Sequence, residues 1–191
     1  VPATSAAMAA GMPPTIEYRW NHRLAASWAA GERAAPGRHL TARFLMAKVK
    51  CGLIQMALKG DGSMEPLAIR DRMIEAHIPF IEGAADQGVQ VLCFQEVFTQ
   101  PYFCPSQDRK WYAAAESIPD GHTTSLMREY AKKHNMVIVV PIYEEEMPGV
   151  YYNTAAVIDA DGSFLGKYRK THIPQVDPGF YEKFFFKPGD L

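Results

Sequence analysis

Apolar residues in the first part of the chain recur with two different periods. Residues 48–58 alternate apolar and polar positions, which predicts a strand that ends before the glycines at 60 and 62. Residues 65–87 predict a helix, and Pro79 inside it should kink or split it. Residues 89–94 are almost wholly apolar, which is typical of a strand covered on both faces. The expected buried face of the helix consists of Leu67, Ile74, Ile78, Ile81 and Ala85.

The second part of the chain predicts one more helix and three more strands. After a loop rich in proline and aromatic residues, a helix should begin near Thr123 and end at Asn135 in the left-handed conformation. Residues 137–142 predict a buried strand, and residues 154–158 and 163–168 predict a hairpin around the turn at 159–162. This order of elements predicts an α/β fold with a mixed sheet.

The net charge and the cysteine content limit which classes of partner and which cellular compartment we expect for this chain. The 191 residues carry 20 Lys plus Arg and 21 Asp plus Glu, so no excess charge favours nucleic acid or an anionic membrane as partner. No apolar run is long enough to predict a transmembrane helix. Three scattered cysteines form no disulfide framework, which favours a reducing, cytoplasmic compartment.

Both ends of the chain are unusual. Residues 1–45 hold twelve alanines and five arginines, whereas all ten lysines lie from Lys48 onward. A transit peptide has such arginine-rich composition, but acids and aromatic residues interrupt this one, and Met46 looks like a natural start. We therefore expect residues 1–45 to be a disordered or non-native extension, and residues 46–191 to form the domain. Because Lys187 to Leu191 resemble a turn entering a new strand, we also expect the fold to be cut there.

Three side chains near strand ends are candidates for chemistry. Glu96 follows the strand at 89–94, where the carboxyl ends of strands collect ligands, and burial there would suit a general base. Lys170 follows the last expected strand, and an ammonium beside a carboxylate stabilises a developing oxyanion. Glu144 lies closest to the strand within an acidic run. From position alone, each residue has a plainer explanation. Glu96 would be a carboxylate that faces solvent, and Glu144 would be part of an acidic loop. Lys170 would belong to a surface basic cluster with Lys167 and Arg169.

Other chemistry has less support. The histidines show no metal-ligand spacing, and His172 is read as a hydrogen-bonding partner. Glycine-rich phosphate loops and the serine elbow of hydrolases are also missing from the sequence. Cys51 and Cys93 read as small core residues, and Cys104 as a packing residue before a proline. We expect no metal and no organic cofactor.

Several segments together resemble the nitrilase superfamily of carbon–nitrogen hydrolases. The resemblance extends from about Val49 to Leu191 and is specific as a combination. Within the superfamily it is most similar to the β-ureidopropionases and N-carbamoyl amidases, through YFC after the glutamate at 96 and through EKFFFKPGD. The segments are KCGLIQMAL, VLCFQEVFTQPYFCPSQDRKW, VIVVPIYEEE, YYNTAAVIDADGSFLGKYRKTHIP and FYEKFFFKPGDL.

The resemblance implies a Glu-Lys-Cys hydrolase. It assigns Glu96 as general base, Lys170 as oxyanion stabiliser, and Glu144 as a carboxylate that helps to hold the lysine and the substrate. The family's nucleophilic cysteine follows the lysine by a few dozen residues, so we expect it beyond Leu191, and none of the three cysteines present occupies its place. The implied fold is a four-layer α-β-β-α sandwich, incomplete here at the C-terminus.

The resemblance leaves alternatives open. The implied substrate is 3-ureidopropionate or another N-carbamoyl-β-amino acid, hydrolysed without cofactor by a homo-oligomer with no nucleic-acid or membrane partner. An N-carbamoylputrescine amidase fits the same segments. A third hypothesis is a catalytically inactive truncated product that only binds a ligand or subunits. Missing strands would leave sheet edges and an apolar face open, with poor solubility.

Overall fold

The computed structural model describes residues 48–190, so the extension predicted for residues 1–45 lies outside the described residues. The strands are β1 (Cys51–Ile54), β2 (Val91–Phe94), β3 (Val137–Met147), β4 (Val150–Ile158), β5 (Phe164–Arg169), β6 (Gln175–Val176) and β7 (Phe180–Tyr181). The helices are α1 (Pro66–Asp86) and α2 (His122–His134), with short 3-10 turns η2 (Cys104–Ser106), η3 (Arg109–Ala114) and η4 (Glu182–Phe184).

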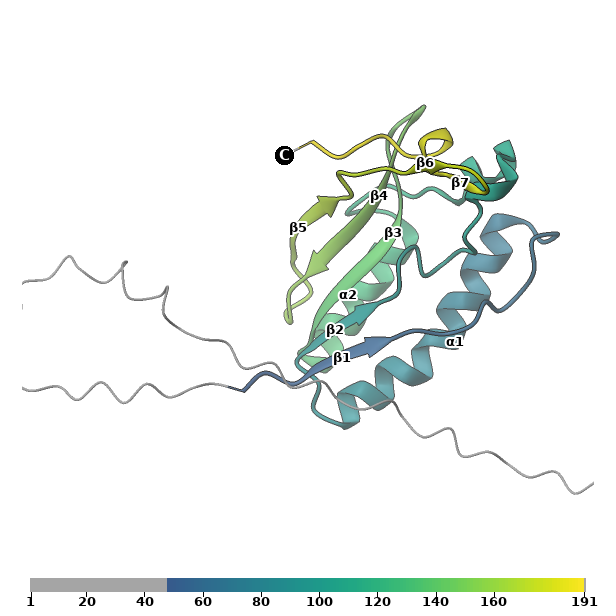
Figure 1. Cartoon of the computed structure of the whole chain (residues 1–191). Coiled ribbons are helices and arrows are strands. Elements are labelled where there is room, and N and C mark those ends of the chain that lie inside the picture. The colour runs from purple at the N-terminus through teal and green to yellow at the C-terminus, as the bar shows by residue number, and fades with distance from the viewer. Residues whose placement is uncertain (1–47, 191) are drawn as a thin grey trace, which may run out of the picture.

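The main sheet has the order β1-β2-β3-β4-β5. Strands β1, β2 and β3 run parallel, whereas β4 is antiparallel to both β3 and β5. Helices α1 and α2 connect the parallel strands and lie on the same face of the sheet (Figure 1). Right-handed crossover connections of this kind put the carboxyl ends of the parallel strands at one edge. The predicted α/β class with a mixed sheet is confirmed.

Every second residue of the central strands faces the helices and is buried. Leu92, Ile138 and Ile158 each lose nearly all their exposure against α1 and α2, because strand side chains alternate between the two faces. Met127 and Ala131 of α2 complete this core. The hydrophobic effect therefore fixes the register of the sheet, since a slip of one residue would expose these side chains.

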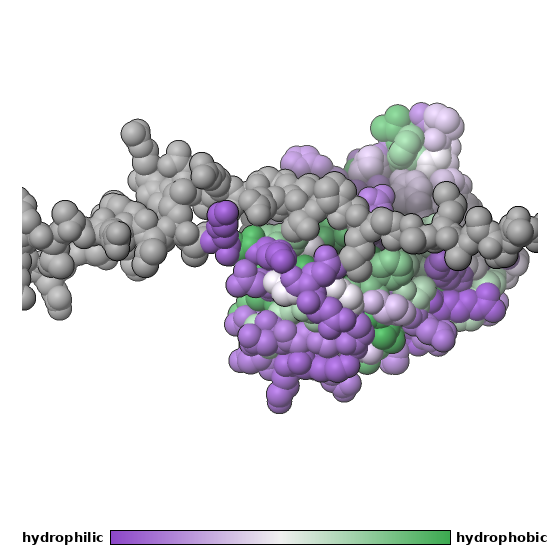
Figure 2. Space-filling model, turned by 90° about the horizontal axis from the view of Figure 1, so that it is seen from below, coloured by the Kyte–Doolittle hydropathy of each residue, from purple (hydrophilic) through white to green (hydrophobic). Residues whose placement is uncertain are grey.

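The opposite face of the sheet is less covered. Val91 and Cys93 are half-buried and Leu53 is 58% exposed, which agrees with the predicted open apolar face. The expectation that the strand at 89–94 is covered on both faces is not met among residues 48–190, because both helices lie on one side. Figure 2, seen from below the view of Figure 1, shows hydrophilic side chains over much of the surface and hydrophobic ones between them.

Helix α1 is continuous, so the expected split at Pro79 is wrong. Pro79 lies on the solvent side, as does Glu75, whose carbonyl loses its partner and can bond water instead. The buried stripe includes Ile74 and Ile81 as predicted, but Leu67 is 47% exposed. Neither helix of residues 48–190 is long and apolar enough to span a membrane.

Several strands differ in length from the prediction, and β4, for example, begins at Val150 rather than at residue 154. Strand β1 ends at Ile54, because the backbone N–H of Met56 donates to the side chain of Gln95 (2.6 Å) instead of continuing a backbone ladder. Strand β3 continues through Glu144 to Met147, where a loop was expected, because β4 pairs with it over its whole length. The predicted hairpin between β4 and β5 is confirmed.

The ends of α2 show one confirmation and one correction. Asn135 ends the helix in the left-handed conformation (φ 51°), as predicted. Thr123 is not the cap, because the helix begins after Gly121 and Thr123 is fully buried. Glu116 instead accepts from the backbone N–H of Thr123 (2.8 Å) and from its hydroxyl, so a residue outside the helix satisfies its first turn.

A second core, made mainly of aromatic side chains, joins the loop after β2 to the last described residues. Phe103 stacks on Trp111 (ring centroids 5.4 Å apart) and meets Phe185 edge-on (4.8 Å). Phe186 packs edge-on against Tyr143 of β3 (5.1 Å). Aromatic pairs in these geometries add about 0.5–1.5 kcal/mol each beyond their buried area. This core therefore holds the segment around η4 against the end of the sheet.

A buried histidine predicts a pH-dependent stability. His77 lies between Phe94 and Phe98, its Nδ1 is 2.7 Å from the carbonyl oxygen of Met73, and burial lowers its pKa below the ordinary 6.5. Below this ordinary pKa value, the imidazole of His77 binds a proton in the unfolded chain but stays neutral in the folded chain. The free energy of unfolding should therefore fall between about pH 7.5 and about pH 5.5, in urea titrations.

The variant His77→Phe keeps the aromatic packing and should reduce this pH dependence, whereas His172→Gln, at an exposed histidine, should leave it unchanged. An equal pH dependence in the parent chain and in His77→Phe would contradict the assignment.

Candidate active site

Glu96 lies two residues past the end of β2, where the parallel strands end. The next residue, Val97, has a left-handed backbone (φ 46°), which a β-branched residue rarely adopts. Strained backbone of this kind is concentrated at functional sites. The side chain of Glu96 is 58% exposed, so the burial expected from the sequence is absent among residues 48–190.

Lys170 directly follows β5 and meets Glu96 across the sheet end. Its Nζ lies 3.1 Å from Oε1 of Glu96 and 2.8 Å from Oε2 of Glu182. Partial burial disfavours its charge, but its hydrogen bonds to the carboxylates of Glu182 and Glu96 outweigh this, so the pKa of Lys170 lies above the ordinary value. The ammonium therefore remains protonated at neutral pH.

Glu182 is a site residue that the sequence analysis missed. It opens the 3-10 turn η4, is 4% exposed, and accepts from the hydroxyl of Tyr102 (3.3 Å) as well as from Lys170. The sequence did contain a signal for Glu182, because this residue lies in EKFFFKPGDL, a segment quoted above for the family resemblance. A buried carboxylate with two donors is held in one orientation.

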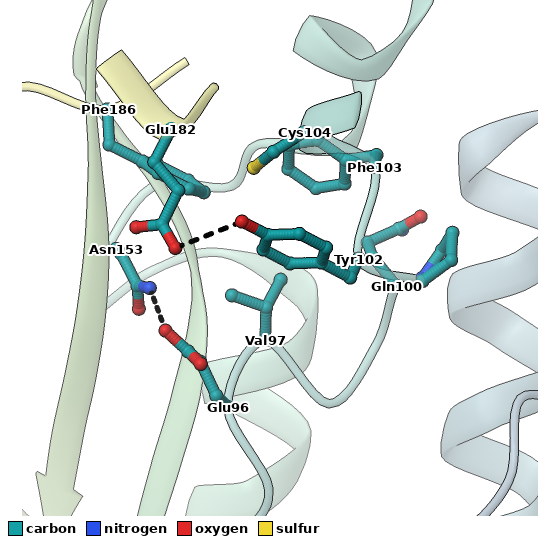
Figure 3. A pocket seen from close by; sticks show the side chains of 10 residues that line it. Glu96, Val97, Gln100, Tyr102, Phe103, Cys104, Asn153, Glu182 and Phe186 are labelled. Atoms are coloured by element: carbon teal, nitrogen blue, oxygen red, sulfur yellow. Dashed lines mark hydrogen bonds between the residues drawn. The ribbon is translucent and has the colours of Figure 1, made fainter. Parts of the chain in front are cut away.

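Glu96 and Glu182 line a small pocket (Figure 3). Figure 3 shows Glu96, Asn153 and Glu182 on one side of the pocket and Tyr102 opposite them. Its volume is about 110 Å³, smaller than the roughly 300 Å³ at which ligand pockets usually begin. Within residues 48–190, this pocket is therefore smaller than a typical complete ligand pocket.

Cys104 lines the same pocket but is a poor nucleophile. It is 1% exposed, and burial together with the nearby charge of Glu182 raises the pKa of its thiol to about 12. Since the thiolate is the reactive form, Cys104 is almost wholly protonated and inert at neutral pH. This agrees with its predicted packing role.

Glu144 has a different set of partners from Lys170. It is fully buried on β3, and its carboxylate accepts from Thr154 (2.6 Å), from Lys167 and twice from Arg169 (2.7 and 2.9 Å). Burial alone would raise its pKa, but these donors lower it below the ordinary value. The lysine that Glu144 contacts is Lys167 rather than Lys170.

Arg169 connects this buried carboxylate to the site. It bonds both oxygens of Glu144, and its guanidinium lies 3.8 Å from the ring centroid of Tyr152. Because Arg169 is the residue before Lys170, its fixed position limits where the backbone of Lys170 can lie. Glu144 is thereby joined to the site through the chain and not through a direct bond to Lys170.

His172 is exposed, with Nδ1 3.0 Å from the hydroxyl of Thr171, in keeping with its predicted hydrogen-bonding role. Among residues 48–190, no group of three His, Cys, Asp or Glu side chains is placed to hold a metal ion.

Comparison with known proteins identifies the family. The family model for carbon–nitrogen hydrolases matches residues 52–191. The chain belongs to the carbon–nitrogen hydrolase family. The crystal structure of a carbon–nitrogen hydrolase from Helicobacter pylori G27 is similar to it, with a TM-score of 0.65 and 34% identity, over 75% of this chain and 46% of that one. The nitrilase-like fold that the sequence predicted is confirmed.

Two curated relatives bear on the reaction. A β-ureidopropionase from Arabidopsis thaliana is 39% identical over 145 residues, which cover 74% of this chain and 35% of the relative. An N-carbamoylputrescine amidase from Solanum lycopersicum is 37% identical over 142 residues, which cover 74% of this chain and 44% of the relative. The chain thus spans less than half the length of these two relatives.

The buried ion pairs predict a large stability loss in Glu144→Gln. The amide cannot balance the charges of Arg169 and Lys167, so the free energy of unfolding should fall by about 3–5 kcal/mol. Urea titrations measure this, and Glu75→Gln, at an exposed position on α1, should change it by less than about 0.5 kcal/mol. Equal losses in the two variants would show that the buried pair does not hold the strand ends together.

Proposed function

We propose that this chain is part of an enzyme that hydrolyses a non-peptide C–N bond in an N-carbamoyl compound. The proposed substrate is 3-ureidopropionate or another N-carbamoyl-β-amino acid, and the products are the β-amino acid, CO2 and ammonia. The observation that carries the proposal is the contact between Glu96 and Lys170 at the pocket of a carbon–nitrogen hydrolase chain. A carboxylate beside a charged ammonium suits acyl transfer, which needs a base and an oxyanion stabiliser.

In the proposed mechanism Glu96 is the general base. It takes the proton from a cysteine thiol, and the thiolate attacks the carbamoyl carbon to form a tetrahedral intermediate. Cys104 is unsuited to this role because its thiol is buried with a raised pKa. The proposal therefore assigns the nucleophile to a cysteine outside these 191 residues.

Lys170 stabilises the oxyanion of that intermediate. Its ammonium is oriented by two carboxylates, Glu96 and Glu182, so little reorganisation is needed when negative charge develops on the substrate oxygen. A preorganised donor of this kind contributes roughly 3–4 kcal/mol. We assign Glu182 the role of holding Lys170, and Glu144 the role of fixing the strand end beside it.

The remaining steps reuse the same carboxyl group. Collapse of the intermediate releases a nitrogen leaving group, which takes the proton from Glu96. Glu96 then removes a proton from water, which attacks the thiol ester and frees the cysteine. Attack by water gives a carbamic acid, which loses CO2 and thereby releases the second nitrogen, so one water molecule is consumed overall. No cofactor takes part in these steps, and the proposal includes a homo-oligomer in a reducing, cytoplasmic compartment.

A second candidate is hydrolysis of N-carbamoylputrescine. It is supported by the Solanum lycopersicum relative, whose identity to this chain is nearly that of the β-ureidopropionase. The two substrates share the carbamoyl group but differ at the far end, where one carries a carboxylate and the other an amine. A basic side chain would recognise the first and an acidic one the second.

Ammonia release tests the proposal on the longest protein that contains this chain. The enzyme should act on N-carbamoyl-β-alanine, and Lys170→Ala should lower kcat by about 10²–10³-fold with an unchanged circular dichroism spectrum. Lys183→Ala, at an exposed lysine near the site, is the matched control and should retain full turnover.

Three results would change the assignment. Preferential turnover of N-carbamoylputrescine would replace the first candidate with the second. Near-normal kcat in Lys170→Ala would contradict the role of that lysine. Failure to release ammonia from either substrate would support the third hypothesis, a protein that only binds.

A further inference from the structure

Asn153 lies in the middle of β4, opposite Tyr143 of β3 in the sheet register. It is only 7% exposed, and its neighbour on the other side is the backbone of Lys170, just beyond β5. Its side chain points into the pocket toward Glu96 (Figure 3). Paired backbone on both sides makes this one of the more rigid positions of the site.

Asn153 contacts both groups of the proposed mechanism. Its side-chain Nδ2 donates to Oε1 of Glu96 (2.6 Å), and its backbone carbonyl accepts from the backbone N–H of Lys170 (2.9 Å). The ammonium of Lys170 donates to the same Oε1 (3.1 Å). One residue of β4 therefore connects two residues that are 74 positions apart in the sequence.

Glu96 needs such a partner more than a buried carboxylate would. It follows a strand of four residues, precedes the strained Val97, and exposes 58% of its side chain. Fixing a free glutamate side chain costs rotamer entropy. A hydrogen bond to a charged group is stronger than one between neutral groups, so it offsets much of that cost. The amide does not titrate, so it donates at every pH.

We propose that Asn153 is a positioning residue, which holds Glu96 in place as the base and sets its distance to Lys170. Both hydrogen bonds to Glu96 found within residues 48–190 end on Oε1. Oε2 is therefore the oxygen that accepts the thiol proton. This inference rests on the proposed function, because it assumes that Glu96 is the base.

A contact with substrate is the competing role for Asn153, since it lines the pocket. The two roles predict different kinetics. Loss of a positioning residue misplaces the base and lowers kcat, whereas loss of a substrate ligand raises KM. One N–H of Nδ2 is already directed at Glu96, which favours the first role.

The contact itself is tested on the 191-residue chain by NMR of 15N-labelled protein. The side-chain amide signals of Asn153 are those that disappear in Asn153→Asp. Glu96→Ala should move them upfield by removing the acceptor, and Glu129→Ala, at an exposed position on α2, should leave them in place. If the side-chain amide signals of Asn153 do not shift in Glu96→Ala, the proposal is wrong, whichever substrate the protein hydrolyses.

The role is tested by kinetics of Asn153→Leu in the longest protein that contains this chain. We expect kcat to fall about 10²-fold with KM unchanged.

Ala156→Gly is the matched control, because Ala156 lies on the same strand but faces the helices. It should lower stability and leave kcat and KM unchanged. A raised KM with normal kcat in Asn153→Leu would make Asn153 a substrate ligand and overturn the positioning role. If the unsubstituted protein hydrolyses neither carbamoyl substrate, the proposed function fails, and the NMR result still decides whether Asn153 holds Glu96.

Discussion

The site depends on a carboxylate that cannot leave the protein interior. Glu144 is fully buried at the far end of β3, and an unpaired charge in such a place costs several kcal/mol. Its partners Lys167 and Arg169 come from β5, so the charge keeps the ends of these strands together. The next residue along the chain is Lys170. An interaction outside the pocket thereby limits the position of Lys170, which contacts two of the residues that line it.

The backbone on either side of Lys170 completes this arrangement. Its N–H donates to Asn153 of β4, and its carbonyl accepts from Gly189 near the end of the chain (2.9 Å each). A side chain at position 189 would place its Cβ 2.4 Å from the carbonyl oxygen of Arg169, so only glycine allows this approach. The segment at 187–190, held by the aromatic core around Phe185, is therefore part of the support for Lys170.

Local sequence patterns predicted the helices and strands better than they predicted the site residues. Asn135 and the turn at 159–162 were predictable, because their conformations depend on neighbouring residues. Helix α1 continues through Pro79 because that residue lies on the face that meets solvent, and sequence periodicity does not show which face this is. Strand β3 continues through Glu144 because β4 pairs with it there, and a local pattern does not show this pairing either. Glu96 and Lys170 were chosen through a family resemblance, since their positions alone favoured plainer roles. Glu182 and Asn153 were missed because their partners are distant in sequence and meet only in the folded chain.

The most direct test of the account is to trap the covalent intermediate. The longest protein containing this chain is mixed with a carbamoyl substrate, quenched in acid and digested, and the modified peptide is located by mass spectrometry. The account predicts an adduct on a cysteine outside residues 1–191, and its loss in Glu96→Gln. An adduct on Cys104, or on either other cysteine of this chain, would contradict the assignment of Glu96 and Lys170 as partners of an external nucleophile.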